Sequence, residues 1–201
     1  MIPSQVKAIL FDLDNTLIDR DLAVAKWLTT MVPADRIEPL LELDRGSYGP
    51  REEVFRIIGA TAGVTSAEAR HRFFREIPDL VRVRPDADEL LARLSVPAII
   101  VTNGPSRFQR AKIVAAGLVP RTAGIVVSSE VGADKPAPAI FHHALEVAGC
   151  SAHEAVMVGD HPINDVAGAE AVGLAAVLVR SRWFAPPAGA HVVDMLTELP
   201  W

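Results

Sequence analysis

Two aspartates lie two positions apart at the end of the first apolar run of the sequence. Residues 6–11 are apolar except for Lys7, and Asp12 and Asp14 follow them. Side chains two positions apart in a strand project to the same side, so we expect both carboxylates to share one site. Two buried carboxylates repel each other unless a cation or a proton lies between them. The segment therefore indicates either an acidic catalytic site or an ordinary acidic turn.

Polar residues also follow three later apolar runs. They are Thr102 with Asn103, Lys135, and Asp160 with Asp165. A threonine hydroxyl and neighbouring backbone N–H groups at a strand end can bind a phosphoryl oxygen. Two carboxylates five positions apart can present hard oxygen ligands to one Mg²⁺. Taken singly, each segment is also explained as a turn, a helix cap or a solvated lysine.

The runs that precede these residues are short and apolar nearly throughout, which is typical of parallel strands buried on both faces. We expect strands at Val6–Phe11, Ala98–Val101, Gly124–Val127, Ala155–Val158 and Leu174–Val179. Helical patterns lie between most of them, at Arg84–Leu94, Arg107–Ala116, Pro138–Ala148 and Asp165–Val172. The alternation predicts an α/β fold with a doubly wound parallel sheet and right-handed crossovers.

The joint pattern favours a functional site over four separate structural features. Asp12, Thr102 and Asp160 each fall at the carboxyl end of a predicted parallel strand, and Lys135 lies in the loop after another. Those ends form the ligand-binding edge of an open α/β sheet. Three carboxylates beside one lysine at one edge are difficult to explain as structure alone.

Residues 18–82 interrupt the strand–helix alternation. They contain helical patterns at Asp21–Met31, Arg51–Gly59 and Ser66–Ile77, with Ser66 expected as an N-cap, and no convincing strand. The segment is too long for a simple loop. We predict a core domain of residues 1–17 and 83–201 and a helical cap domain of residues 18–82. The tail, Trp183–Trp201, is rich in Pro and Ala and shows no clear pattern.

Composition narrows the classes of function. The net charge of −5 and the absence of a basic run argue against a nucleic-acid partner. One cysteine, Cys150, excludes an intramolecular disulfide, and we expect it to be a small structural residue. The sequence has no signal-peptide pattern and no apolar stretch near the ~20 residues of a membrane span. We therefore expect a cytoplasmic protein without a membrane partner.

With these motifs in order, the sequence resembles the haloacid dehalogenase (HAD) superfamily, in the phosphatase branch whose helical cap is inserted after the first strand. The resemblance covers nearly the whole chain. The family's DxDxT motif corresponds to Asp12, Asp14 and Thr16, its strand-ending Thr to Thr102, its Lys to Lys135, and its GDxxxxD motif to Gly159, Asp160 and Asp165. Lys135 also lies in a Ser-Glu-x-Gly-x-x-Lys-Pro context that is specific to this branch.

The resemblance implies a Mg²⁺-dependent phosphatase that acts on a small phosphorylated metabolite. Asp12 would form an aspartyl-phosphate, and Asp14, with a raised pKa beside the Asp12 charge, would serve as general acid and base. The implied metal ligands are the Asp12 carboxylate, the Asp14 carbonyl and Asp160, with Asp165 bound directly or through water. The implied phosphate-binding residues are Thr102, Asn103 and Lys135. Thr16 is expected to shape the turn.

Related activities stay open to different degrees. A phosphomutase shares every motif, whereas a dehalogenase would not need Asp14 and the full metal set. A phosphonate hydrolase would need a cap lysine, for which Lys26 is the one candidate. A non-catalytic protein on this fold would be expected to lose Asp12, Asp14 or Lys135. In the cap, Arg45 and Tyr48 are our candidate substrate contacts, in what we expect to be a flexible loop.

Overall fold

The computed structural model describes residues 5–201, and the chain divides into two compact units. One unit comprises Met1–Ile18 and Val83–Trp201, and the other comprises Asp19–Arg82. Among residues 5–201, no helix has both the length and the apolar character that crossing a membrane requires.

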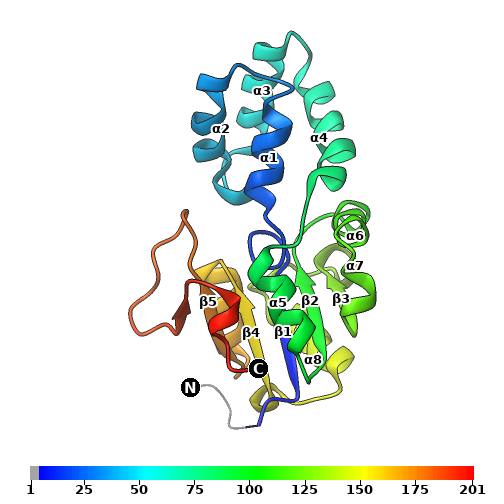
Figure 1. Cartoon of the computed structure of the whole chain (residues 1–201), viewed down its shortest axis with the longest axis vertical. Helices are drawn as coiled ribbons and strands as arrows, with labels where there is room; N and C mark the ends of the chain where they lie inside the picture. Colours follow the sequence, from blue (N-terminus) through cyan, green and yellow to red (C-terminus); the bar gives the residue numbers. More distant parts are fainter. Residues whose placement is uncertain (1–4) are drawn as a thin grey trace. The chain divides into compact units, whose positions relative to one another are not determined.

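The larger unit is built on a six-stranded parallel sheet with the strand order β3-β2-β1-β4-β5-β6 (Figure 1). The strands are β1 (Ala8–Phe11), β2 (Ala98–Thr102), β3 (Gly124–Val127), β4 (Ala155–Gly159), β5 (Ala175–Val179) and β6 (Val192–Val193). β1 is central and pairs Ile9 with Ala98 of β2 and with Val156 of β4. The predicted parallel α/β sheet is confirmed, and it gains a sixth strand in the tail that we did not predict.

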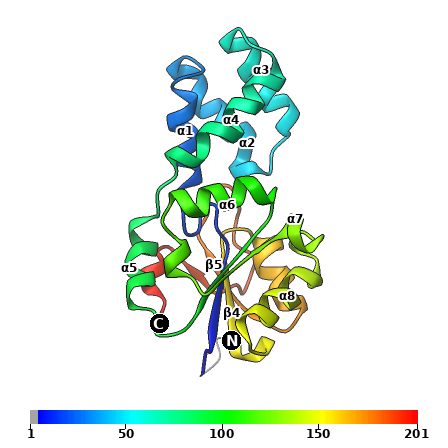
Figure 2. The same cartoon turned by 90° about the vertical axis from the view of Figure 1, so that its right-hand side faces the viewer.

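Helices cover both faces of this sheet. They are α5 (Pro85–Arg93), α6 (Ser106–Ala115), α7 (Ser128–Val131), α8 (Pro138–Ala148) and α9 (Gly168–Ala171), together with the short turns η3 (Val119–Arg121), η4 (Ala152–Glu154), η5 (Pro162–Ala167) and η6 (Leu196–Glu198). Figure 2 shows α5 and α8 on opposite sides of the sheet. On the α8 side, Leu10, Met157 and Phe141 belong to one fully buried apolar cluster. The helix expected at Asp165–Val172 begins earlier, because η5 is a π-helical segment that continues into α9.

The smaller unit consists of four helices: α1 (Arg20–Leu28), α2 (Ile37–Asp44), α3 (Arg51–Ala62) and α4 (Ser66–Leu80), with the turn η1 (Ala34–Arg36) before α2. We did not predict α2. The N-cap of α4 is Thr65 rather than Ser66, because the Thr65 hydroxyl accepts a hydrogen bond from the Glu68 amide at 3.1 Å. Edge-to-face contacts of Phe73 with Trp27 and Phe55, at 5.3 and 5.4 Å between ring centroids, form the centre of this unit.

A tight turn, η2 (Arg45–Ser47), stands where we expected a flexible loop. Arg45, Gly46 and Ser47 have φ values of 46°, 64° and 82°, and Asp44 Oδ2 accepts a hydrogen bond from the Ser47 amide at 3.1 Å. Asp44 also forms a 2.6 Å ion pair with Arg20, whose side chain is buried. Helix α1 and the end of α2 therefore hold this turn in a defined conformation.

Candidate active site

The carboxyl ends of two paired strands, β1 and β4, bring together three of the acidic residues that we singled out in the sequence. Asp12 follows β1, and Asp160 and Asp165 follow β4. Carboxylate oxygens of these three buried residues lie within 4.8 Å of one another. The Asp12 amide donates to the carbonyl of Val158 at 2.9 Å, so the pairing of β1 with β4 fixes the backbone of Asp12.

Lys135 lies inside this acidic cluster. Its Nζ is 2.7 Å from Asp12 Oδ1 and 2.6 Å from Asp165 Oδ1, and the residue is 3% exposed. Asn103 positions the loop that carries Lys135, since its Oδ1 accepts from the Lys135 amide at 2.8 Å and its Nδ2 donates to the Lys135 carbonyl at 2.9 Å. The Asn103 side chain thus supports the lysine, and its contact with phosphate stays a prediction.

The turn after β4 fixes Asp165. Asp165 Oδ2 accepts from the His161 amide at 2.9 Å, and the Nδ1 atom of His161 accepts from the amides of Ile163 and Asn164 at 3.1 and 3.0 Å. Burial lowers the pKa of His161, and an Nδ1 that accepts hydrogen bonds agrees with a neutral ring. His161 is therefore a capping residue of this turn.

Burial makes the carboxylates of Asp12 and Asp160 difficult to ionise. It raises the pKa of Asp12 to about 7, an increase that Lys135 opposes and that the charge of Asp165 strengthens. Burial, together with the charges of Asp12 and Asp165, also raises the pKa of Asp160 well above its usual value. Three buried carboxylates against the one ammonium of Lys135 leave an excess of negative charge.

This donor set fits a hard divalent cation such as Mg²⁺, which prefers carboxylate oxygens. Asp12 and Asp160 are the better candidates for direct ligands. Both oxygens of Asp165 already accept hydrogen bonds, one from Lys135 and one from the His161 amide. Ser181 donates to Asp160 Oδ2 at 3.3 Å and orients that carboxylate.

Asp14 has partners that our sequence analysis missed. The charge of Asp14 contributes to the raised pKa of Asp12, and Lys112 Nζ lies 2.6 Å from Asp14 Oδ1 and 2.5 Å from Asp14 Oδ2. Gln109 Nε2 donates to Asp14 Oδ2 at 3.2 Å and to Thr102 Oγ1 at 2.5 Å. In the sequence, two polar residues three positions apart in the helix after the Thr102 strand do not distinguish a solvated helix face from a pair that contacts Asp14.

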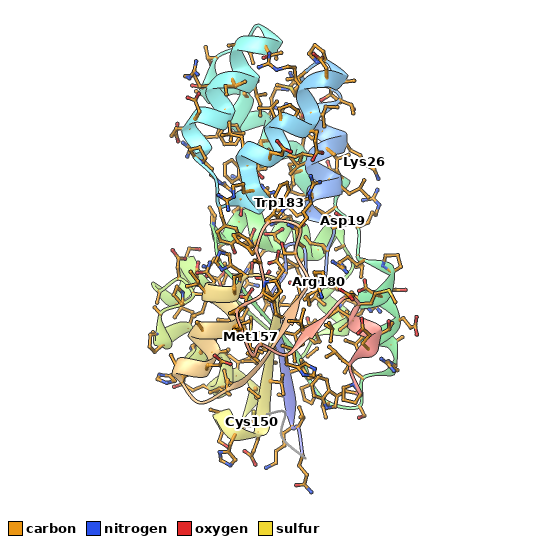
Figure 3. All side chains as sticks on the ribbon, turned by 90° about the vertical axis from the view of Figure 1, so that its left-hand side faces the viewer. Asp19, Lys26, Cys150, Met157, Arg180 and Trp183 are labelled. Atoms are coloured by element: carbon orange, nitrogen blue, oxygen red, sulfur yellow. The ribbon has the colours of Figure 1, made fainter. Side chains whose placement is uncertain are left out.

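The segment after β5 returns to the same edge of the sheet. Figure 3 shows Trp183 and Cys150 at opposite ends of the core, in line with their positions after β5 and before β4. Next to Trp183, the Phe184 ring lies 4.3 Å from that of His161, and Ser181 contacts Asp160. The tail that we did not place in the sequence therefore contributes to the wall of the site.

The remaining sequence candidates lie elsewhere. Thr16 is fully buried after β1, and its hydroxyl has no hydrogen-bond partner among the described residues, so its role in shaping this turn stays a prediction. Arg45 and Tyr48 belong to the smaller unit, in and directly after the turn η2, and their contact with a substrate stays a prediction.

Gly159 at the end of β4 has no room for a side chain. A Cβ atom at this position would lie 2.3 Å from the Asp165 carboxyl group. We expect Gly159→Ala to displace Asp165 from Lys135, to destabilise the protein by about 1–3 kcal/mol as overpacking does, and to lower activity strongly. Denaturant unfolding and phosphatase assays measure the two effects. Gly117→Ala is the control for activity: its φ of 68° strains an alanine, but the added Cβ meets no atom within 4 Å, so it destabilises the chain without displacing Asp165.

Known proteins resemble this chain in both sequence and fold. A family described as haloacid dehalogenase-like hydrolase matches residues 6–173. The phosphoserine phosphatase of Thermus thermophilus is 40% identical over 148 residues, which cover 70% of this chain and 59% of that protein. The ribulose-1,5-bisphosphate 5-phosphatase of Halopiger xanaduensis is 31% identical over 204 residues, which cover 85% of this chain and 83% of that protein.

A solved structure agrees with these matches. The crystal structure of a HAD phosphatase from Thermococcus onnurineus superposes with a TM-score of 0.70 at 27% identity. The superposition covers 96% of this chain and 95% of that chain, so the fold is shared over nearly the full length of both.

Proposed function

The chain belongs to the haloacid dehalogenase-like hydrolase family, and from this premise we propose that it is a Mg²⁺-dependent phosphatase of a small phosphate monoester. The observation that carries the proposal is the Lys135 ammonium between Asp12 and Asp165, at the edge where β1, β2 and β4 end. A phosphatase of this kind needs a carboxylate nucleophile and a cation that can both contact the same phosphoryl group. Both are provided here by buried, mutually bonded side chains.

In the proposed first step an Asp12 oxygen attacks phosphorus. A bond forms between that oxygen and phosphorus, while the bond between phosphorus and the leaving oxygen breaks. Asp14 gives a proton to the leaving oxygen and then removes one from the water that hydrolyses the aspartyl-phosphate. Thr102 and Lys135 bind the phosphoryl oxygens, on which negative charge builds.

Asp12 and Asp160 would hold the metal, with the Asp14 carbonyl and Asp165 as further proposed ligands. When bound, Mg²⁺ supplies positive charge that screens the phosphate from the approaching carboxylate. The carboxylates must be ionised to bind it, and burial opposes that ionisation.

We expect Mg²⁺ to stabilise the protein more at pH 8 than at pH 5.5. The pKa of Asp12 is about 7 in the folded protein against an ordinary value of 3.8, so protonation of Asp12 stabilises the fold at low pH, and this contribution is lost as pH rises through about 7. Mg²⁺ competes with those protons, so its own contribution grows over the same range. Thermal unfolding with Mg²⁺ or with EDTA at both pH values measures the difference. An equal gain in Tm at both would contradict the assignment of Asp12 as a ligand.

We propose a small phosphorylated metabolite as substrate, since related proteins are named for phosphoserine and for ribulose-1,5-bisphosphate. Arg45 and Tyr48 of the smaller unit are the proposed substrate contacts. The test is hydrolysis of p-nitrophenyl phosphate and of a panel of metabolite phosphates with and without Mg²⁺. Magnesium-dependent release of phosphate supports the proposal. Absence of release from every ester would contradict it.

A further inference from the structure

We propose that Lys112 and Gln109 of helix α6 are positioning residues that hold the Asp14 carboxylate in the orientation needed for proton transfer to the leaving group. The inference rests on the proposed function, in which Asp14 supplies that proton. It concerns two residues whose side chains contact Asp14, which comes almost a hundred positions earlier in the chain.

Lys112 holds both oxygens of Asp14. The distances from Nζ to Oδ1 and Oδ2 are 2.6 and 2.5 Å, and the lysine side chain is 1% exposed. Lysine normally keeps its ammonium group in water, and burying it is unfavourable unless a partner compensates its charge, as Asp14 does here. An ion pair with both carboxylate oxygens restricts rotation of the carboxylate, which a single contact would not do. Because a neighbouring ammonium favours the ionised form of a carboxyl group, the proton that passes through Asp14 to the leaving oxygen is supplied by the Lys112 ammonium, which becomes neutral in the step.

Gln109 ties the same carboxylate to the proposed phosphate-binding residue. Its Nε2 donates to Asp14 Oδ2 at 3.2 Å, to Thr102 Oγ1 at 2.5 Å and to the Asn103 carbonyl at 3.0 Å. One amide group therefore fixes the distance between the proposed proton donor and a proposed ligand of the phosphoryl group. Proton transfer requires such a distance to be held within a few tenths of an ångström.

Both residues project from the same face of one rigid element. Gln109 and Lys112 are three positions apart, and Phe108 and Ile113 beside them anchor α6 through buried apolar side chains. The Lys112 ammonium also lies 4.7 Å from the centroid of the Phe108 ring. Apolar contacts therefore hold α6 in place, and Gln109 and Lys112 are not needed to anchor the helix and can orient Asp14.

The test compares two aryl phosphates that have nearly the same shape. The p-nitrophenolate group leaves readily without a proton, whereas the phenolate group is more basic and benefits from general-acid catalysis. The parameter kcat/KM reports the attack and the departure of the leaving group and excludes hydrolysis of the aspartyl-phosphate. We expect Lys112→Met to lower kcat/KM about 10- to 100-fold for phenyl phosphate. For p-nitrophenyl phosphate we expect a loss below about threefold.

Further variants separate positioning from folding. Gln109→Met leaves no unpaired charge in the site and should show the same dependence on the leaving group, with a smaller loss. Lys7→Met is the matched control: it removes the surface ion pair with Glu154, next to the amino end of β1, and should behave as wild type with both esters. In the Asp14→Asn background, Lys112→Met should add no further loss with phenyl phosphate.

Equal losses with both esters in Lys112→Met and Gln109→Met would overturn the inference, because a merely structural role lowers both rates together. Additive losses in the double variant with Asp14→Asn would overturn it as well. Failure of the proposed function gives a different result: the wild-type protein would hydrolyse neither ester with Mg²⁺ present, and the inference would fall with its premise.

Discussion

Replacing Asp12 with asparagine is expected to lower kcat for phosphate release by at least about 10³-fold, because the amide cannot form the acyl phosphate. The same variant should stay folded. Burial raises the pKa of Asp12 to about 7, so at pH 8 the wild-type protein keeps an ionised carboxylate buried, which lowers its stability. Asparagine has the same shape without the charge, and this loss of stability disappears in the variant. Without Mg²⁺, the Tm at pH 8 should equal or exceed that of the wild type.

Asp134→Asn is the matched control for this variant. Asp134 lies directly before Lys135 but is exposed, so removing its charge should change kcat by less than about threefold. Steady-state assays with p-nitrophenyl phosphate measure both variants. Turnover by Asp12→Asn at the wild-type rate, from protein free of contaminating phosphatase, would show that Asp12 is not the nucleophile.

Replacing Lys135 with methionine should produce the largest combined loss of stability and activity. The change leaves Asp12 and Asp165 without the buried ammonium that lies 2.7 and 2.6 Å from them, and loss of one partner of a buried ion pair costs about 3–5 kcal/mol. Phosphate binding also loses its cation, which should lower kcat/KM by about 10²- to 10³-fold. Urea unfolding and steady-state kinetics measure the two losses.

The pH dependence of this variant distinguishes charge from packing. Without Lys135, the pKa of Asp12 rises further above about 7, so protonation can neutralise the cluster in mildly acidic solution. The loss of stability should therefore be smaller at pH 5.5 than at pH 8, and Mg²⁺ should reduce it at pH 8. A loss that depends neither on pH nor on Mg²⁺ would mean that Lys135 contributes through packing alone.

The parallel sheet could be predicted because its strands are buried on both faces. Such strands are apolar at nearly every position, as at Ala8–Phe11 and Ala155–Gly159, so the pattern is visible without knowledge of the neighbours. The polar residues that follow them stand out against that background. Asp12 and Asp160 were found in this way, and the parallel register then places their carboxylates at one edge.

Helix α6 shows where this reasoning fails. The helical period within Arg107–Ala116 assigns Phe108, Ile113 and Val114 to the apolar face, but Val114 is 65% exposed, whereas Gln109 and Lys112 are buried. Hydrophobic periodicity assigns polar side chains to the solvent. It cannot show that a carboxylate 98 positions earlier in the chain compensates the buried ammonium.

The strand in the tail was missed for a different reason. Strand β6 has two residues, Val192 and Val193, and exists because it pairs with β5, so its own pattern is too short to detect. Likewise, Ser181 reaches Asp160 through the path of the chain after β5 rather than through any local motif. Contacts of this kind depend on tertiary packing, which overrides local pattern.

Trapping the covalent intermediate tests whether Asp12 is the nucleophile. The protein is mixed with p-nitrophenyl phosphate and Mg²⁺, quenched in acid during turnover, digested and mapped by mass spectrometry. We expect one phosphoryl group on the peptide that contains Asp12, dependent on Mg²⁺ and absent from Asp12→Asn. Turnover accompanied by a phosphoryl group on any other residue would contradict it.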